Sequence, residues 1–305
     1  MNSESQNKKT VLIVGATGYI GSAVVAEAVK QGHRVIAVTR SAQSADKFPG
    51  AEVVQAEVPD PASIGAAVTS EVDAVISCLG CHSGLAKDFD AIDYQATLNV
   101  LNAAMESRVK EFILLSAICV RRPELPLQLA KLKFEDELMR SGIDYTIVRP
   151  TAYFWVFDSQ KKMIAKGRPG FLIGSGEQSC HNPISKEDLA EFMVGSIGNE
   201  ERRNRVFVIG GPEVPGNVIS YKDALTMIFK SQGKEPKFLS VPGWAMTGMI
   251  GITWFLGLMF RKVGEFSELL KIIYYYMRYD MRAMGYGSDT FQQHVAQTIG
   301  EPGGK

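Results

Sequence analysis

The sequence lacks several features that mark whole classes of protein. Its 305 residues carry 33 basic and 33 acidic side chains, so the formal net charge is zero. No run of lysine or arginine provides the basic footprint of a nucleic-acid-binding protein. Four cysteines are too few for a disulfide scaffold and fit a reducing compartment. The N-terminal segment MNSESQNKK has no apolar core and no arginine, so we expect neither a signal peptide nor a transit peptide.

One internal segment lacks charge altogether. The 23 residues between Lys237 and Arg261 include no charged side chain, and a transmembrane helix needs only about 20 apolar residues. However, Pro242 and four glycines weaken a helix there, and the mean hydropathy of the whole chain is only −0.01. We interpret the segment first as a substrate-lobe helix at the mouth of a pocket, second as a peripheral membrane contact and third as a span. An ordinary core helix is the competing interpretation.

Apolar runs alternate with amphipathic stretches up to about residue 150. The alternation predicts an α/β fold, in which right-handed crossovers build a doubly wound parallel sheet of the Rossmann type. We assign this dinucleotide-binding domain to residues 9–150. The predicted strands, which read as buried on both faces, are 11–15, 35–39, 52–56, 74–78, 112–116 and 145–149. The predicted helices lie near 19–31, 61–70, 88–108 and 128–141.

After Pro150 this regular alternation ends. We expect a helix near 153–166, a short strand at 171–174 and a capped helix that begins after Ser185. These elements predict a smaller C-terminal substrate lobe over residues 151–300, packed with the first domain as one compact unit. Such lobes close over the carboxyl ends of the sheet, where these folds bind ligands.

The strongest motif follows the first predicted strand and opens the first predicted helix. Its first glycine permits a tight turn, its second lets the backbone approach a pyrophosphate, and its third lets helix and strand pack closely. Unpaired N–H groups at the helix N-terminus would bind the phosphates. A glycine turn kept for packing alone is the alternative, but the strand–turn–helix context favours dinucleotide binding. The residues assigned to the cofactor here are Gly15, Thr17, Gly18, Tyr19, Ile20 and Gly21.

The residues after the second strand indicate which dinucleotide binds. An acid there would bind the ribose hydroxyls and select NAD, but the chain has Arg40 and Ser41. A guanidinium suits a 2′-phosphate, so we predict NADPH, with a solvated surface arginine as the competing interpretation. The third and fourth strands are followed by further residues assigned to the cofactor: Glu57, Val58, Cys78 and Leu79.

Several segments in order resemble one family. GATGYIG, Arg40, LLSA, AKLKFEDEL and IVRPTAYF resemble the atypical short-chain dehydrogenase/reductase group with NmrA-like members. Together with SCLG, IDYQATLNVLNAA and NPISKEDLA, they resemble the NADPH-dependent divinyl chlorophyllide a 8-vinyl reductases over residues 9 to 300. The resemblance implies a tetrapyrrole substrate whose 8-vinyl group is reduced to ethyl in chlorophyll or bacteriochlorophyll biosynthesis. It also implies a cytoplasmic bacterial form, or a plastid location for a processed eukaryotic form.

The predicted active site departs from the standard short-chain pattern, in which a tyrosine stands four residues before a lysine. Ser116 and Lys131 occupy the serine and lysine positions, but Leu127 stands where the tyrosine is expected. A tyrosine passes a proton to or from a carbonyl oxygen, whereas reduction of a vinyl group creates no alkoxide. The missing tyrosine therefore counts against an alcohol dehydrogenase. It is compatible with alkene reduction and equally with no catalysis.

The resemblance also suggests roles for the residues near the nicotinamide. Lys131 would act in catalysis by binding the nicotinamide ribose and supporting the developing negative charge, unless it is a solvated helix charge. Ser116 would contact the cofactor or only cap a strand end. Pro150 and Thr151 lie where family members wrap the nicotinamide carboxamide with backbone.

Three aromatic residues are expected to contact the substrate: Tyr153, Phe154 and Trp244. The first two follow the sixth strand, and Trp244 lies in the uncharged segment, whose Met- and Trp-rich composition suits a flat apolar tetrapyrrole. Tyr153 is the candidate proton donor, with bulk water as the alternative. No Cys/His spacing resembles a zinc site, so we predict no metal.

Two other functions stay open at this point. One is a non-catalytic, NmrA-like NADP-binding regulator or assembly factor, and the other is a reductase of a different conjugated alkene. The sequence predicts no particular oligomeric state.

Overall fold

The chain folds into two units in a computed structural model that describes residues 8–41, 46–81 and 85–297. Unit 1 comprises Met1–Arg149 and Leu189–Phe207. Unit 2 comprises Pro150–Asp188 and Val208–Lys305. One boundary therefore falls at residue 150, where the alternating pattern of the sequence ends. The segment Leu189–Phe207 belongs to unit 1, whereas the sequence pattern assigned it to the C-terminal lobe.

Unit 1 is built on a parallel sheet, as the buried apolar runs predict. The strand order β6-β5-β4-β1-β2-β3 reverses direction at β1, which is the doubly wound arrangement and confirms the predicted fold class. Val11 pairs with Val35 on one side and with Ala74 on the other. The sheet reaches eight strands through β9 and β12, whose register is Met284 with Ile209. The strands of unit 1 are β1 (Thr10–Val14), β2 (Arg34–Thr39), β3 (Glu52–Gln55), β4 (Ala74–Ser77), β5 (Glu111–Leu115) and β6 (Asp144–Pro150).

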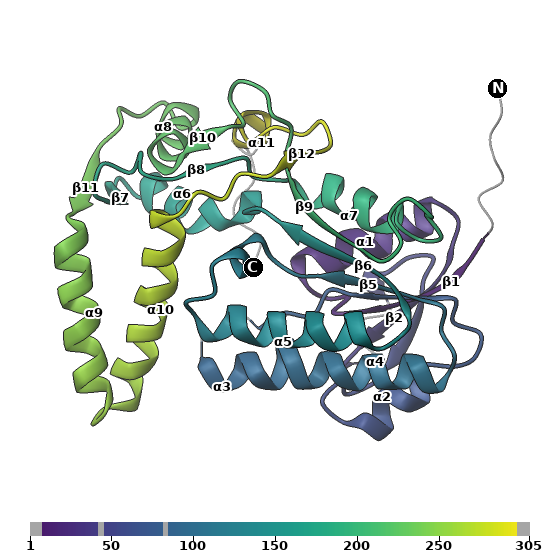
Figure 1. Cartoon of the computed structure of the whole chain (residues 1–305). Helices are drawn as coiled ribbons and strands as arrows, with labels where there is room; N and C mark the ends of the chain where they lie inside the picture. The colour runs from purple at the N-terminus through teal and green to yellow at the C-terminus, as the bar shows by residue number, and fades with distance from the viewer. Residues whose placement is uncertain (1–7, 42–45, 82–84, 298–305) are drawn as a thin grey trace. The chain divides into compact units, whose positions relative to one another are not determined.

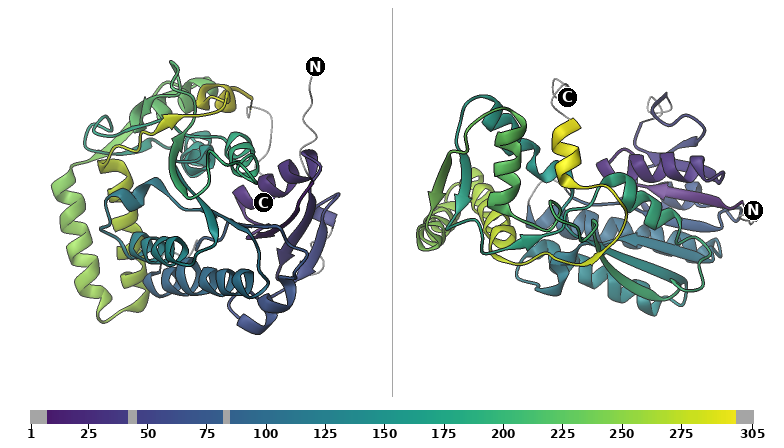
Figure 2. Two further views of the ribbon diagram at one scale, coloured as in Figure 1. Left: turned by 45° about the vertical axis from the view of Figure 1, so that its right-hand side comes forward. Right: turned by 90° about the horizontal axis from the view of Figure 1, so that it is seen from above.

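Helices cover both faces of this sheet. Figures 1 and 2 show α1 on one face and α2, α4 and α5 on the other. Local signals begin two of them: Asp60 caps α2 by accepting the N–H of Ala62, and Pro126 opens α5. The helices are α1 (Tyr19–Lys30), α2 (Pro61–Ala67), α3 (Ala86–Phe89), η2 (Asp90–Ala96), α4 (Thr97–Glu106), η3 (Ile118–Arg121) and α5 (Pro126–Arg140).

The helix expected near 88–108 is not regular. It consists of α3, the π-helical turn η2 and α4, so the wider turn shifts the side chains that follow it relative to a regular α-helix. The hydroxyl of Thr97 donates to the carbonyl of Ile92, five residues earlier. Hydrophobic periodicity did not reveal the π-helical turn. The turn matters for the candidate site because Asp93 lies within it.

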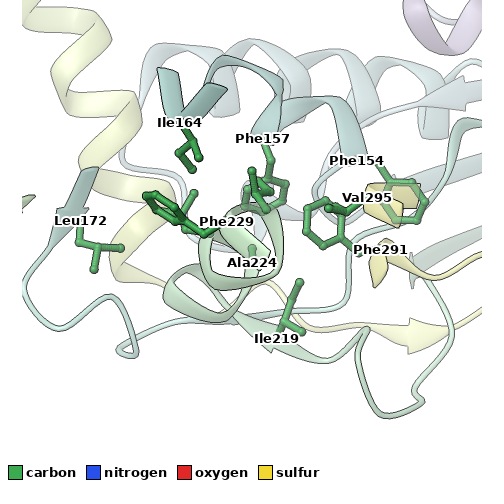
Figure 3. Close-up of a cluster of buried hydrophobic side chains, with 11 residues drawn as sticks. Phe154, Phe157, Ile164, Leu172, Ile219, Ala224, Phe229, Phe291 and Val295 are labelled. Atoms are coloured by element: carbon green, nitrogen blue, oxygen red, sulfur yellow. The ribbon is translucent and has the colours of Figure 1, made fainter. Parts of the chain in front are cut away.

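Unit 2 contains its own hydrophobic core. Phe154, Phe157 and Phe291 pack together, with ring centroids 5.7 Å apart for Phe154–Phe291 and 4.8 Å apart for Phe157–Phe291 (Figure 3). The elements after β6 are η4 (Phe154–Phe157), α6 (Asp158–Ala165), β7 (Gly170–Ile173), β8 (Cys180–His181), α7 (Lys186–Val194), β9 (Arg205–Gly210), β10 (Ile219–Ser220), α8 (Tyr221–Ser231), β11 (Phe238–Val241), α9 (Gly243–Gly257), α10 (Arg261–Arg278), β12 (Met284–Gly285) and α11 (Phe291–Gln297). α7 and β9 each run from one unit into the other.

The uncharged segment forms β11 and α9. β11 pairs in parallel with β7, in the register Phe238 with Gly170, and α9 then runs antiparallel beside α10 (Figures 1 and 2). Among the residues that the structure describes, no helix has both the length and the apolar character that a membrane crossing requires. Pro242 and β11 take up the first residues of the uncharged segment, which leaves 15 residues for α9.

Candidate cofactor and active site

The glycine motif forms the tight turn between β1 and α1. Gly15 has a φ of +75°, and a Cβ placed on it would lie 2.6 Å from the carbonyl oxygen of Cys78. A Cβ on Gly21 would lie 2.1 Å from the carbonyl oxygen of Gly15. Both distances are far below a van der Waals contact, so side chains at these two positions would force the loop, β4 and α1 apart.

The N-terminus of α1 lies directly after this turn. Gly18 is the N-cap and has no side-chain cap, while its own N–H donates to the carbonyl of Gly15 at 3.0 Å. The first backbone N–H groups of a helix have no acceptor within the helix, and they lie at the positive end of the helix dipole, which is the arrangement that binds phosphate groups. Among the described residues no side chain lies within 4 Å of a Cβ placed on Gly18, so the residues present fit a dinucleotide pyrophosphate.

Arg40 lies directly after the carboxyl end of β2 and is open to solvent. Its side chain is exposed, and among the described residues it has no ion-pair partner. Its backbone carbonyl accepts a hydrogen bond from Gln55, which anchors the strand end to β3. Ser41 is also exposed, and its carbonyl accepts the hydroxyl of Thr39 at 2.8 Å. The guanidinium is thus available for an anionic group.

The remaining adenosine-side residues lie at the same edge of the sheet. Glu57 is exposed, and its N–H donates to the hydroxyl of Ser63. Val58 is buried, and its carbonyl accepts the amide of Asn99. Leu79 is half-buried in the loop after β4.

Cys78 is a thiol rather than a reactive thiolate. Burial raises the pKa of its thiol to about 12, so it stays protonated at neutral pH. Cys78 and Cys81 are both free, and they follow a sheet strand rather than opening a helix. The C-x-x-C spacing therefore belongs to the nucleotide loop.

Lys131 forms a buried ion pair with Asp93. Its ammonium lies 2.8 Å from Oδ1 of Asp93, with 13% of the Lys131 side chain and none of the Asp93 side chain exposed. The other oxygen, Oδ2, accepts the backbone N–H of Cys81 at 3.1 Å. Asp93 thus ties the lysine of α5 to the loop that follows β4, where the cofactor site is predicted. Lys133 points elsewhere, with its ammonium 3.6 Å from the ring centre of Tyr94.

A second buried carboxylate, that of Glu135, accepts a hydrogen bond from Ser116, which was predicted to contact the cofactor. The hydroxyl of Ser116 donates to Oε1 of Glu135 at 2.5 Å. Arg149, near the end of β6, donates hydrogen bonds to the same carboxylate from both Nε and Nη2. The side chain of Glu135 is fully buried, and that of Arg149 is largely so. Ser116 is therefore part of a buried hydrogen-bond network directly after β5.

Leu127 is half-buried one helical turn before Lys131 on α5. No hydroxyl occupies this position, so α5 offers no phenol or alcohol one turn before Lys131.

Comparisons with known proteins bear directly on this site. A sequence model described as NAD(P)H-binding matches residues 15–200. The maize protein named divinyl chlorophyllide a 8-vinyl-reductase, chloroplastic, is 37% identical over 97% of this chain and 80% of its own length. The chain belongs to the divinyl chlorophyllide a 8-vinyl-reductase family.

Two further proteins are similar to the chain at lower identity. A Trieres chinensis protein named photosystem II assembly factor Ycf39 is 26% identical over 75% of this chain and 73% of its own length. A solved NADPH complex of the Escherichia coli quinone oxidoreductase QOR2 has a TM-score of 0.71 at 19% identity, covering 94% of this chain and 99% of that one. At this identity the structural likeness shows the fold alone.

The other residues predicted for this family member lie in unit 2. Thr151 is buried, and its hydroxyl donates to the carbonyl of Asn182 at 2.7 Å, while its N–H donates to Ile209. Pro150 is buried at the end of β6. Tyr153 is half-buried and Trp244 is 80% exposed.

Phe154 differs from the expectation that it contacts substrate. It is only 3% exposed, and its ring packs against Phe291 and His294 in the unit 2 core (Figure 3). Because η4 begins at this residue, the helical turn directs the ring inward. Phe154 therefore supports the lobe rather than lining an open surface.

No metal cluster of three or more His, Cys, Asp or Glu side chains occurs in the part of the chain that the structure describes. His181 is almost fully buried, and its Nε2 lies 3.2 Å from the hydroxyl of Ser179. Burial lowers the pKa of His181 to about 4, so the ring is neutral at physiological pH.

A hollow at the opposite, amino-terminal edge of the unit 1 sheet is lined by residues such as Lys9, Glu111 and Arg203. Ligands of doubly wound sheets bind beyond the carboxyl ends of the strands. This hollow is therefore not the cofactor site, whose residues gather around the glycine turn.

Sequence reasoning missed Asp93 and Glu135. Glu135 stands four residues after Lys131, and this spacing places both side chains on one face of α5. That signal was present in the sequence. Asp93 carried no such signal, because its partner lies 38 positions along the chain and its orientation depends on the π-helical turn.

Proposed function

We propose that this protein reduces the 8-vinyl group of divinyl chlorophyllide, or of protochlorophyllide, to an ethyl group with NADPH. The observation that carries the proposal is the likeness to the maize reductase along nearly the whole chain, together with Leu127 in place of the carbonyl-chemistry tyrosine. The substrate is a small tetrapyrrole, and no nucleic acid takes part.

NADPH rather than NADH is the proposed cofactor. Arg40 supports this choice, because its exposed guanidinium can form paired, charge-assisted hydrogen bonds with a 2′-phosphate. Glu57 is the first carboxylate after β3. It would flank the adenine and not the 2′-phosphate. The tight turn at Gly15 and the N-terminus of α1, whose N-cap Gly18 has no side chain, support a pyrophosphate there.

The reaction adds one hydride and one proton across a carbon–carbon double bond. When bound, NADPH supplies the hydride, and the vinyl group becomes ethyl as NADP⁺ forms. Lys131 would hold the nicotinamide ribose, and its positive charge would favour negative charge that develops in the conjugated macrocycle. Asp93 would keep the ammonium in one position, which limits the reorganisation needed during the reaction.

The second hydrogen arrives as a proton. Tyr153 is the proposed donor, since its phenol is half-buried directly after β6, and bulk water is the competing source. A Tyr153→Phe variant separates the two: turnover falls with a phenol donor and is unchanged with water.

The decisive experiment incubates the purified protein with divinyl chlorophyllide and NADPH deuterated at C4 of the nicotinamide. We expect a product with one deuterium in its ethyl group, separated by chromatography and identified by mass spectrometry. Protein with Lys131→Ala serves as the matched control and should turn over much more slowly. Absence of product at saturating cofactor would overturn the proposal.

The same experiment distinguishes the two other functions. Tight binding of both NADP⁺ and NADPH without turnover would indicate a non-catalytic NADP-binding regulator or assembly factor. Reduction of another conjugated alkene, but not of the tetrapyrrole, would indicate a different reductase.

The proposed setting is the plastid for a eukaryotic form and the cytoplasm for a bacterial form. The word chloroplastic in the name of the maize relative supports the first of these.

A further inference from the structure

The α9–α10 hairpin carries apolar side chains on the side that a water-soluble helix would make polar. Of the α9 residues, only Met246 is buried, while Trp244, Phe255 and Ile252 are 80%, 62% and 64% exposed. No charged residue interrupts the chain from Phe238 to Phe260. A helix that is apolar on every side is typical of a protein interior or a lipid environment.

The exposed side of α9 covers more than half of its circumference. The side that packs towards α10 carries Met246, Met249, Ile250 and Thr253, and the hydroxyl of Ser267 on α10 donates to the carbonyl of Ile250. With about 100° between successive residues, the exposed apolar side chains occupy an arc of roughly 200° on the other side. These exposed side chains are Trp244, Ile252, Trp254, Phe255, Leu256 and Leu258.

The turn between the two helices is also apolar. Leu258, Met259 and Phe260 are 69%, 76% and 58% exposed, whereas connections between helices in soluble proteins are normally polar. Arg261 and Lys262 follow at once and are exposed. Arg261 also forms an exposed ion pair with Glu265, with 2.9 Å between Nε and Oε1, which leaves its side chain 77% exposed. The tip of the hairpin thus presents an apolar end with cationic residues directly behind it.

Close contact between two glycines gives this tip a defined shape. A Cβ on Gly257 would lie 2.6 Å from Cα of Gly264, so the two helix backbones approach directly. Small residues allow the same close approach between helices in membranes. The helices therefore stay together at the tip although few buried side chains connect them there.

We propose that the tip of the α9–α10 hairpin inserts into one leaflet of a membrane that contains anionic lipids. The apolar end would enter the acyl region, and Arg261 and Lys262 would meet anionic headgroups. Trp254 near the tip suits the boundary between headgroups and acyl chains. The 15 residues of α9 extend about 22 Å, less than the roughly 30 Å of the hydrocarbon core, so α9 is too short to cross the core and only the tip of the hairpin enters one leaflet.

Lipid fits this surface better than a second copy of the chain. A folded partner covers one face of a helix, whereas the exposed apolar arc of α9 and the tip point in many directions. Fluid acyl chains can surround such a convex shape. The cationic pair next to the apolar tip adds charge complementarity to an anionic leaflet and gives no complementarity to an identical, equally cationic tip.

Flotation of the full-length protein with vesicles tests this proposal without substrate or cofactor, so its result is independent of the reductase activity. We expect the protein to float with phosphatidylcholine–phosphatidylglycerol vesicles and much less with pure phosphatidylcholine. Replacing Phe255 and Phe260 with serine should weaken binding by at least about tenfold for each phenylalanine that is buried in lipid. Arg261→Gln and Lys262→Gln should each cost about fivefold, and only on anionic vesicles.

Met284→Ser provides the matched control, because Met284 is 57% exposed in unit 2 but lies outside the hairpin. Its vesicle binding should equal that of the wild type. Circular dichroism establishes that each variant is folded, and Trp emission should shift to the blue on binding anionic vesicles.

Light scattering of the same proteins measures their oligomeric state and so tests whether the apolar surface binds a second copy of the chain instead of lipid. A stable dimer that Phe255→Ser converts to a monomer would identify the surface as an interface between copies. That result, or wild-type protein that does not float with anionic vesicles, would overturn the proposal.

Discussion

Asp93 holds the ammonium of Lys131 at 2.8 Å with one carboxylate oxygen and the backbone N–H of Cys81 at 3.1 Å with the other. This single buried side chain therefore joins three parts of unit 1: the loop after β4, the π-helical turn η2 and α5. Lys131 is fixed in place before any ligand arrives. In the proposed reductase, such fixation makes the lysine a prepared contact for the nicotinamide ribose.

A double-mutant cycle tests whether Asp93 acts through Lys131. Asp93→Asn leaves a largely buried ammonium without its counter-charge, and breaking such a pair costs about 3 kcal/mol of stability. NADPH affinity should fall as well. In the presence of Lys131→Met, Asp93→Asn should have much less effect on both quantities, with a coupling of about 1–3 kcal/mol. Calorimetric titration and urea unfolding measure the two, and additive effects would mean that Asp93 has a separate role.

Arg40→Ala should change cofactor preference. An exposed guanidinium that binds the 2′-phosphate contributes about 1.5–3 kcal/mol through charge-assisted hydrogen bonds, so NADPH affinity should fall about 10- to 100-fold. NADH affinity should barely change, because NADH lacks that phosphate. Arg205→Ala is the matched control, since Arg205 is an exposed arginine at the start of β9. Equal losses for NADPH and NADH would show that Arg40 does not recognise the phosphate.

The third glycine of the motif is predicted to tolerate no side chain. In Gly21→Ala the new Cβ would meet the carbonyl oxygen of Gly15 at 2.1 Å, so the turn must shift at a cost of about 1–3 kcal/mol. NADPH binding should be lost with it. Gly65→Ala, inside α2, has no atom within 4 Å of its Cβ and should stabilise the protein by up to about 1 kcal/mol. Thermal unfolding and NADPH titration of the pair separate the clash from the general effect of adding a methyl group.

These residues also show what could be predicted from sequence. Gly15, Gly21 and Arg40 are recognisable because the turn, the helix start and the strand end are all local, so the spacing along the chain determines their geometry. Asp93 is different, since a regular helix over 88–108 would have turned its side chain elsewhere. Only the π-helical turn, which hydrophobic periodicity does not reveal, brings it to Lys131.

The second unit was harder to predict for a related reason. Phe154 follows a strand in the sequence and was expected to contact the substrate, but the direction of its ring is set by η4 and by Phe291, 137 positions later. Long-range packing of this kind leaves no periodic signal. For α9 the absence of charge was visible, yet the sequence could not say that most of its apolar side chains are exposed.

His181 should make the stability of the protein depend on pH between about 4 and 6.5. Burial lowers its pKa to about 4 from an ordinary value near 6.5. As the pH falls through this window, the unfolded chain binds a proton that the folded chain does not, so the free energy of unfolding decreases. The contribution of neutral His181 to the free energy of unfolding is fully retained above pH 6.5. By pH 4 the free energy of unfolding has fallen by an amount on the order of 3 kcal/mol. Urea unfolding across this range should give a shallower pH dependence for His181→Gln than for the wild type, because glutamine does not titrate. Parallel curves would mean that His181 can be protonated within the folded protein, through an opening of its buried contact with Ser179.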